Sequence, residues 1–240
     1  MRIDGRGAGQ LRRVKMTADY TKYAEGSVLM EMGDTKVICN ASVEVGVPPF
    51  LRDSGKGWVT AEYAMLPRAT GTRSRRDISS LKLNGRAAEI QRLIGRALRS
   101  VTDLTALDGY TVTVDCDVIQ ADGGTRCASI TGGYLALWLA CKKMMEQGLI
   151  TRMPLTAQVA AISAGVVDGE VLLDLCYQED SRAEADCNII LSSSGGIVEL
   201  QGTGEERPFT EAELKGILAA AKRGNAALFR AQKKIMDARG

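Results

Sequence analysis

The sequence contains no histidine among its 240 residues. The usual serine and cysteine nucleophile systems depend on a histidine base, and histidine is the side chain that ordinarily titrates near neutral pH. The sequence therefore excludes Ser-His-Asp and Cys-His nucleophile systems of the usual kind, and it excludes a histidine general base. Any reaction must depend on carboxylates, cations, hydroxyl groups, a metal ion, or a substrate that supplies its own nucleophile.

Long apolar runs and paired cysteines are also missing. The longest uncharged runs, 127–141 and 153–167, have 15 residues each, whereas a membrane-spanning helix needs roughly 20. The first residues, MRIDGRGAGQLRR, hold no apolar stretch typical of a signal peptide. We therefore expect a cytoplasmic protein with no membrane partner. The six cysteines form no CxxC pair, and most lie in apolar or alternating stretches, which favours buried thiols over zinc sites or disulfides.

Charge is unevenly distributed, although 31 basic and 29 acidic residues nearly cancel. Residues 52–99 hold 11 basic and four acidic side chains, a stretch that suits a polyanion. Residues 168–186 hold seven acidic side chains and one basic one, which suits a hard cation. A solvated surface is the simpler interpretation of either cluster alone. Together, cationic phosphate contacts and metal-binding carboxylates are what phosphoryl transfer requires.

Hydrophobic periodicity predicts strands in both halves of the chain. Two turn signals, Gly33-Asp34 and Asp168-Gly169, predict hairpins. The predicted strands lie at 27–32, 35–44, 58–65, 111–119, 157–167, 170–175, 186–192 and 197–202.

Three helices and one long loop complete the predicted order. Apolar steps of three and four predict a helix over 86–101, and a second of about 20 residues ends near Gln147-Gly148. Thr210 and Glu213 form a capping box for the last helix. Residues 66–84 are polar and lack an apolar pattern, so we expect a loop. No linker separates the halves. We therefore expect one α+β domain, 1–240, made of two similar strand-then-helix halves that share one core.

The strongest local motif is DGGTRCAS at 122–129, between a predicted strand and a predicted helix. Two glycines let the backbone approach a ligand closely, and the N–H groups at a helix start attract an anion. Thr125 adds a hydroxyl group and Arg126 a guanidinium. A phosphate would fit there, although two glycines before a helix more often form only a tight turn.

Eight longer stretches cover almost the whole chain. They are RIDGR at 2–6, YTKYAEGSVL at 20–29, GDTKVIC at 33–39, VPPFLR at 47–52, GWVTAEYAMLPRAT at 57–70, GRAAEIQRLIGRALR at 85–99, DCDVIQADGGTR at 115–126 and EDSRAEADCN at 179–188. Together they resemble the bacterial ribonuclease PH family. The resemblance implies a ribonuclease PH-like domain that acts as a phosphorolytic 3′ to 5′ exoribonuclease and trims transfer RNA precursors. Inorganic phosphate attacks the terminal phosphodiester and releases a nucleoside diphosphate, and the reverse reaction extends RNA 3′ ends. Because phosphate is the nucleophile, such an enzyme needs no histidine base.

The resemblance also implies roles for individual residues. Arg86, Gly124, Thr125 and Arg126 correspond to the phosphate-binding site. Asp180 and Asp186 correspond to the catalytic carboxylates, with Mg²⁺ expected between them and the scissile phosphate. Taken without the surrounding motif, two aspartates six residues apart are more typical of exposed loop or edge-strand carboxylates.

Three arginines of the predicted loop, Arg68, Arg73 and Arg76, match those that in this family hold the subunit ring together and contact RNA. The expected assembly is a homohexamer, a trimer of dimers, and the expected partners are transfer RNA precursors and other RNA 3′ ends. A non-catalytic RNA-binding ring subunit is the alternative, but such a subunit would be expected to lack the phosphate arginines or the carboxylates. A hydrolytic nuclease is a third interpretation. Such an enzyme would be expected to have more carboxylates, to bind two metal ions, and would not need a binding site for a free anion.

Several positions depart from the family pattern. Asp53 replaces a usual glycine and Ala87 a common threonine, while Cys127, Cys176 and Cys187 replace Thr, Asp and Met. We place Cys176 on a strand over 172–177. The lost carboxylate there is expected to reduce metal affinity without abolishing activity.

Overall fold

The computed structural model describes residues 2–76 and 84–239. Part of the predicted loop, 77–83, lies outside the described residues, together with the charges of Asp77 and Lys82. The elements are β1 (Val14–Ala18), β2 (Gly26–Met32), β3 (Thr35–Val45), η1 (Pro49–Leu51), β4 (Trp58–Met65), α1 (Gly85–Arg99), η3 (Leu104–Leu107), β5 (Tyr110–Gln120), α2 (Thr125–Glu146), β6 (Val159–Val167), β7 (Glu170–Leu173), α3 (Tyr177–Asp180), β8 (Ala185–Ser192), β9 (Ile197–Gly204) and α4 (Glu211–Asp237).

The first half forms a five-stranded sheet in the order β1-β2-β3-β5-β4. The predicted hairpin is confirmed, since β2 and β3 pair from Met32 and Thr35 outward. In β3, Val37, Cys39 and Ala41 are buried while the residues between them are half-buried, as alternation requires. β4 pairs in parallel with β5, and α1 connects the two strands.

The second half forms a four-stranded antiparallel sheet in the order β7-β6-β8-β9. β6 and β7 turn at Asp168 and Gly169, whose φ angles are 50° and 74°. Positive φ at both central residues is the geometry of a tight hairpin turn, and aspartate followed by glycine tolerates it. The predicted hairpin at this position is therefore confirmed.

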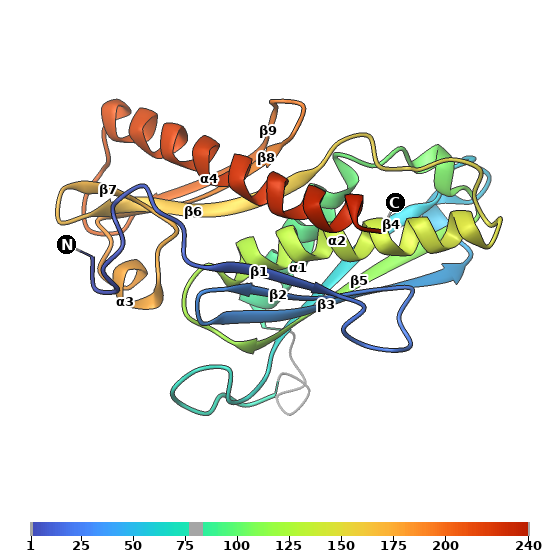
Figure 1. Cartoon of the computed structure of the whole chain (residues 1–240), viewed down its shortest axis with the longest axis horizontal. Helices are drawn as coiled ribbons and strands as arrows, with labels where there is room; N and C mark the ends of the chain where they lie inside the picture. The colour runs from blue at the N-terminus through green and yellow to red at the C-terminus, as the bar shows by residue number, and fades with distance from the viewer. Residues whose placement is uncertain (1, 77–83, 240) are drawn as a thin grey trace.

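Helices α2 and α4 join the two sheets into one core. α2 packs against β2 and β3 of the first sheet and also against β6 of the second, and α4 packs against β6 and β7 (Figure 1). Every residue of β6 is buried, and one cluster of buried side chains includes both sheets. The α+β class and the two strand-then-helix halves are confirmed. The single domain over 1–240 stays a prediction.

Two details of the predicted order were wrong. β1 was missed, since its five residues form an edge strand that, among the described strands, pairs with β2 alone. The strand predicted to reach 175 or 177 ends at Leu173, because Asp174 has a left-handed φ of 56° and α3 begins at Tyr177. The second half thus has a four-residue helix where the first half has the 15-residue α1.

The positions that depart from the family pattern fit their surroundings. Asp53 has a φ of 61°, in the left-handed region that favours glycine but that aspartate tolerates. Ala87 is buried on α1 directly after Arg86. Cys187 is buried on β8 against Gly202, where an added Cβ would lie 2.7 Å from the Cys187 sulfur. All six cysteines are free and buried, whereas the sequence predicted burial for most of them. None of the helices in the described part of the chain combines the length and the apolarity needed to cross a bilayer.

Candidate active site

The six residues predicted to bind phosphate or to act as catalytic carboxylates line one cavity of about 360 Å³. They come from the beginnings of α1 and α2, the end of α3 and the beginning of β8. Arg86, Gly124, Thr125, Arg126, Asp180 and Asp186 share this wall with Ser163, Ser181, Arg182, Ala183, Asn188, Glu205 and Glu206. Arg86 and Asp186, which are 100 positions apart in the sequence, are therefore brought together, and the roles of all six residues in catalysis stay predictions.

The glycine turn before α2 shapes one side of the cavity. Gly123 and Gly124 have φ angles of 73° and 66°, a conformation that L side chains rarely adopt. A Cβ on Gly123 would lie 2.6 Å from the carbonyl oxygen of Leu175, so glycine is required there. Gly124 is the N-cap of α2 and offers no side-chain cap. The first N–H groups of α2 are therefore available to an anion.

Buried polar side chains hold this turn from behind. The Arg12 guanidinium donates to the carbonyl oxygen of Asp122, and its Nη2 lies 2.7 Å from Asp174 Oδ1. The Thr35 hydroxyl donates to the Gly123 carbonyl at 2.7 Å and accepts from the Asp122 amide at 3.0 Å. Sequence reasoning missed all of these partners, because no local pattern links residue 12 or 35 to residues 122 and 174.

Two arginines supply positive charge to the cavity. Arg86 is the second residue of α1, whose N-cap Asn84 accepts a hydrogen bond from the Arg86 amide at 3.0 Å. Its side chain is exposed and forms no ion pair with any described residue. Arg126 donates to Gln201 Oε1 at 2.9 Å and lies 3.7 Å from Glu89 Oε1. Both guanidiniums act to lower the pKa of Asp180, against the raising effect of burial, which is larger.

Asp186 is the less solvated of the two predicted carboxylates. Burial, and then the neighbouring charge of Asp180, raises the pKa of Asp186 to about 6. Asp186 Oδ2 accepts a hydrogen bond from Asn188 Nδ2 at 3.3 Å, while its buried Oδ1 has no hydrogen-bond partner among the described residues. The Cys127 thiol donates to Asn188 Oδ1 at 3.2 Å and so helps to orient that amide.

The carboxylate oxygen atoms at this site suit a magnesium ion as ligands. Mg²⁺ prefers oxygen ligands, and it commonly takes one or two carboxylates and fills its other positions with water and substrate phosphates. The unpartnered Oδ1 of Asp186 is a free oxygen donor of this kind, and Asp180 lines the same cavity. Among the described residues, no three His, Cys, Asp or Glu side chains gather into a metal-binding group. The predicted pair would therefore hold the ion with help from substrate oxygens.

A buried ion pair positions α3, which ends in Asp180. Arg2 donates to both carboxylate oxygens of Glu179, at 2.7 and 2.5 Å, and to the carbonyl oxygen of Leu173 at 2.8 Å. Glu179 Oε2 also accepts from the Cys176 amide at 3.1 Å. Cys176 is the N-cap of α3, and it lines a second cavity rather than the one with Asp180 and Asp186. The expected effect of Cys176 on metal affinity stays a prediction.

The loop after β4 borders the site on another side. Thr70, Gly71 and Thr72 line a cavity of about 580 Å³ together with Arg86, Gly123, Gly124, Thr125 and Asp180. The loop is tied down where the Ala121 amide donates to the Ala69 carbonyl at 2.8 Å. The predicted loop arginines Arg68, Arg73 and Arg76 are exposed and do not line either cavity next to Asp180. Their assembly and RNA-binding roles stay predictions.

Comparison with known proteins places this chain in a family. The model described as "3′ exoribonuclease family, domain 1" matches residues 10–143, and the model for domain 2 of that family matches residues 157–224.

Three solved structures are similar to this chain. Rrp46 of rice (Oryza sativa) has a TM-score of 0.76 at 22% identity, over 98% of each chain. An archaeal exosome core has a chain with a TM-score of 0.75 at 22% identity, over 97% of this chain and 91% of that one. The Archaeoglobus fulgidus exosome with RNA bound to the active site has a chain with a TM-score of 0.76 at 22% identity, over 100% of this chain and 92% of that one. At this identity the structures show a shared fold, but the two family models together span most of the sequence. The chain therefore belongs to the 3′ exoribonuclease family and contains both of its ribonuclease PH domains.

Proposed function

We propose that this protein is a phosphorolytic 3′ to 5′ exoribonuclease of the bacterial ribonuclease PH type. It trims the 3′ ends of transfer RNA precursors with inorganic phosphate, releases nucleoside diphosphates, and in reverse adds nucleotides to RNA 3′ ends. One observation carries the proposal. A single cavity combines an uncapped helix N-terminus and two arginines with a pair of carboxylates.

The attacking phosphate binds at the beginning of α2. Backbone N–H groups there, the Thr125 hydroxyl and the guanidiniums of Arg86 and Arg126 give it hydrogen bonds and balance its charge. The Tyr63 hydroxyl lies 2.9 Å from Thr125 Oγ1 and holds that side chain in place. A hydrolase would have no use for a site that binds a free anion as the nucleophile.

The reaction exchanges one phosphorus–oxygen bond for another. An oxygen of the bound phosphate attacks the phosphorus of the 3′-terminal phosphodiester, and the bond to the 3′ oxygen of the preceding nucleotide breaks. That oxygen takes up a proton, and the terminal nucleotide leaves as its 5′-diphosphate. The protein contributes positioning and charge balance, which account for most of the catalysis in phosphoryl transfer.

Asp180 and Asp186 face the leaving oxygen and would hold Mg²⁺, which supplies charge neutralisation on the phosphoryl oxygens when bound. Without a bound ion, burial and the charge of Asp180 raise the pKa of Asp186 to about 6, so Asp186 keeps a proton in a fraction of molecules near neutral pH, whereas a bound Mg²⁺ would favour its ionised form. That proton makes a second role chemically accessible, namely protonation of the leaving 3′ oxygen.

The assembly that we propose is a homohexamer of three dimers in the cytoplasm, and each chain folds as one domain. Arg68, Arg73 and Arg76 lie on an exposed loop next to the site, where they can reach a neighbouring subunit or RNA. This placement supports the proposed roles for the loop.

The test is phosphate dependence in both directions. The protein is incubated with a 3′-extended transfer RNA and Mg²⁺, with and without phosphate, and RNA length is followed on a denaturing gel. Shortening should require phosphate, and excess nucleoside diphosphate should lengthen the RNA and liberate phosphate. RNA binding without any phosphate-dependent change in length would instead favour the non-catalytic ring subunit. If the RNA is shortened at the same rate with and without phosphate, the result would favour a hydrolase.

A further inference from the structure

The outward side of α4 carries positive charge without interruption. Between residues 215 and 234 there are six basic residues and no acidic one. We call them the α4 basic face, and they are Lys215, Lys222, Arg223, Arg230, Lys233 and Lys234. Steps of seven and eight residues return to the same side of an α-helix, so these side chains form one stripe. All six are exposed.

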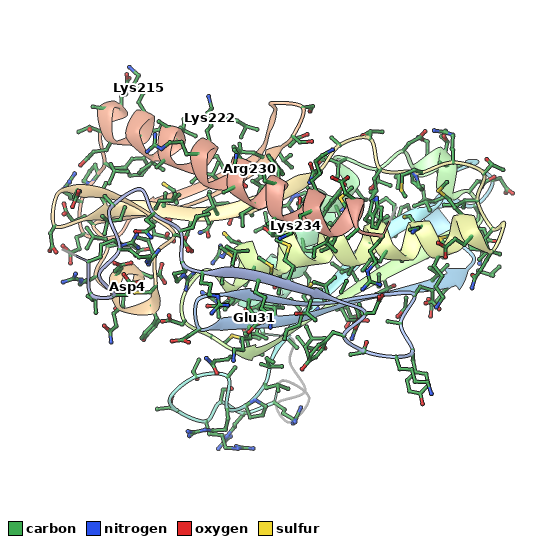
Figure 2. The ribbon with its side chains drawn as sticks, in the orientation of Figure 1. Asp4, Glu31, Lys215, Lys222, Arg230 and Lys234 are labelled. Carbon is green, nitrogen blue, oxygen red and sulfur yellow. The ribbon has the colours of Figure 1, made fainter. Side chains whose placement is uncertain are left out.

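Packing fixes the direction in which this stripe points. Ile217, Ala221 and Leu228 on the opposite side of α4 are fully buried, and the helix packs against β6 and β7. Lys215 and Lys222 extend away from the body of the molecule in Figure 2, where Arg230 and Lys234 continue the same helix. From Lys215 to Lys234 the stripe covers roughly 29 Å, at 1.5 Å per residue.

The charge of the α4 basic face is largely unneutralised. Among the described residues, its only ion pair joins Lys233 Nζ and Asp237 Oδ1 at 3.9 Å. Glu213 in the first turn is engaged elsewhere, with Arg207 at 2.6 Å. Like charges at three and four residues apart, such as Arg230 with Lys233 and Lys234, destabilise an isolated helix. A solvated surface needs no such segregation of charge, whereas a bound polyanion would offset the repulsion.

The chemistry of this surface favours nucleic acid over a protein or a membrane. No large apolar side chain of α4 is exposed among the described residues. Protein interfaces have a desolvated core that is usually apolar or aromatic, and helices that lie on membranes insert apolar side chains. A phosphate backbone needs only regularly placed cations, and it is recognised without regard to sequence.

We propose that the α4 basic face binds the phosphate backbone of the substrate RNA, away from the 3′ end that enters the active site. This inference rests on the proposed function, which makes RNA the substrate. Glu205 and Glu206 line the site cavity, and only four residues separate Glu206 from the beginning of α4. The Lys215 end of the stripe is therefore tethered close to the rim of the site. A structured RNA whose 3′ end is bound can place its body along the helix.

The test compares two variants that lose the same charge. One carries Lys215→Gln, Lys222→Gln and Arg230→Gln on the α4 basic face, and the control carries Lys15→Gln, Lys22→Gln and Arg152→Gln on other exposed elements. Binding of a fluorescent 3′-extended transfer RNA is measured by anisotropy without phosphate, so that no turnover occurs, over a range of KCl concentrations. Circular dichroism checks that α4 remains helical.

The α4 variant should bind this RNA on the order of tenfold more weakly at 0.1 M salt, and the slope of log K against log salt should be shallower by about two to three. The control should match the wild type. Both variants should degrade a short single-stranded oligonucleotide normally with phosphate. Unchanged affinity and slope in the α4 variant, or an equal loss in the control, would overturn the proposal. If the wild-type protein binds transfer RNA through this face but never degrades the oligonucleotide, the proposed function is refuted. The proposal that the α4 basic face binds RNA is then still supported.

Discussion

Asp174 accepts two hydrogen bonds from Arg12 through a single oxygen, Oδ2: the Arg12 backbone amide lies 2.8 Å away and the guanidinium Nε 3.1 Å away. Both residues are buried, with 6% of Arg12 and none of Asp174 exposed. The same guanidinium reaches the carbonyl oxygen of Asp122, so one ion pair links the segment before β1, the segment after β7 and the glycine turn. The turn that shapes the predicted phosphate site therefore depends on a contact between the two halves.

Changing this pair should affect both stability and phosphate binding. Asp174→Asn leaves the buried Arg12 charge with only the longer ion pair to Asp122 Oδ2 at 3.7 Å, so the free energy of unfolding should fall by about 3 kcal/mol in denaturant titrations. Arg12→Lys keeps a positive charge but cannot reach the carboxylate and the Asp122 carbonyl together. The KM for phosphate should rise in this milder variant, while the KM for RNA changes little. Equal changes in the two constants would show that the pair does not position the turn.

Arg86→Ala and Arg126→Ala should each weaken phosphate binding. A charge-assisted hydrogen bond contributes about 1.5 to 3 kcal/mol, so the KM for phosphate should rise on the order of ten- to a hundredfold. Arg92→Ala, on the exposed side of α1, is the matched control and should have no effect. Phosphate saturation curves at fixed RNA concentration measure the change. Wild-type curves for both site variants would mean that phosphate binds elsewhere.

Asp180→Asn and Asp186→Asn are nearly isosteric changes, so assembly and RNA binding should be preserved. Turnover should fall on the order of a hundredfold or more, because charge stabilisation at the leaving oxygen is lost. Asp168→Asn removes a charge from an exposed turn and serves as the control, with an expected rate equal to that of the wild type. Single-turnover rates with saturating phosphate and Mg²⁺ provide the comparison. The carboxylates have no catalytic role if both site variants keep the normal rate.

Replacement of Arg68, Arg73 and Arg76 by alanine should break the proposed hexamer into dimers and weaken binding of full-length transfer RNA. The reason is that exposed loop cations can bridge subunits and contact phosphates. Sedimentation velocity and anisotropy report the two effects separately. A control with Arg13, Arg52 and Arg92 replaced by alanine loses the same charge from other exposed positions. A loop variant that sediments as a hexamer and binds RNA normally would show that the loop is merely solvated.

Local sequence patterns predicted most of the secondary structure. The hairpins at Gly33-Asp34 and Asp168-Gly169, and the capping box at Thr210 and Glu213, were found because each signal lies within a few adjacent residues. α3 was missed for the opposite reason. Strand β7, which precedes α3, ends at Leu173 because Asp174 has a left-handed φ angle. The four residues of α3 form a single helical turn, which is too short to show a helical periodicity in the sequence.

The candidate site also has one part that a local motif indicates and another part that no local motif indicates. The glycine turn and Arg126 stand in one contiguous motif, so the sequence indicated an anion site there. The supports behind it could not be found, because Arg12 meets Asp174 from 162 residues away and Arg2 meets Glu179 from 177 residues away. Buried arginine–carboxylate pairs depend on the tertiary fold, and a single sequence gives no local sign of them.

The most direct test of this account follows the phosphate itself. The protein, a 3′-extended transfer RNA, Mg²⁺ and radiolabelled inorganic phosphate are mixed, and the released nucleotides are separated by chromatography. Bound phosphate should outcompete water as the nucleophile, because the cavity holds an anion site and the chain has no histidine to activate water. One label should enter the β-phosphoryl group of a nucleoside 5′-diphosphate for each nucleotide removed. Unlabelled nucleoside monophosphates, released at the same rate when phosphate is omitted, would show that the reaction is hydrolysis.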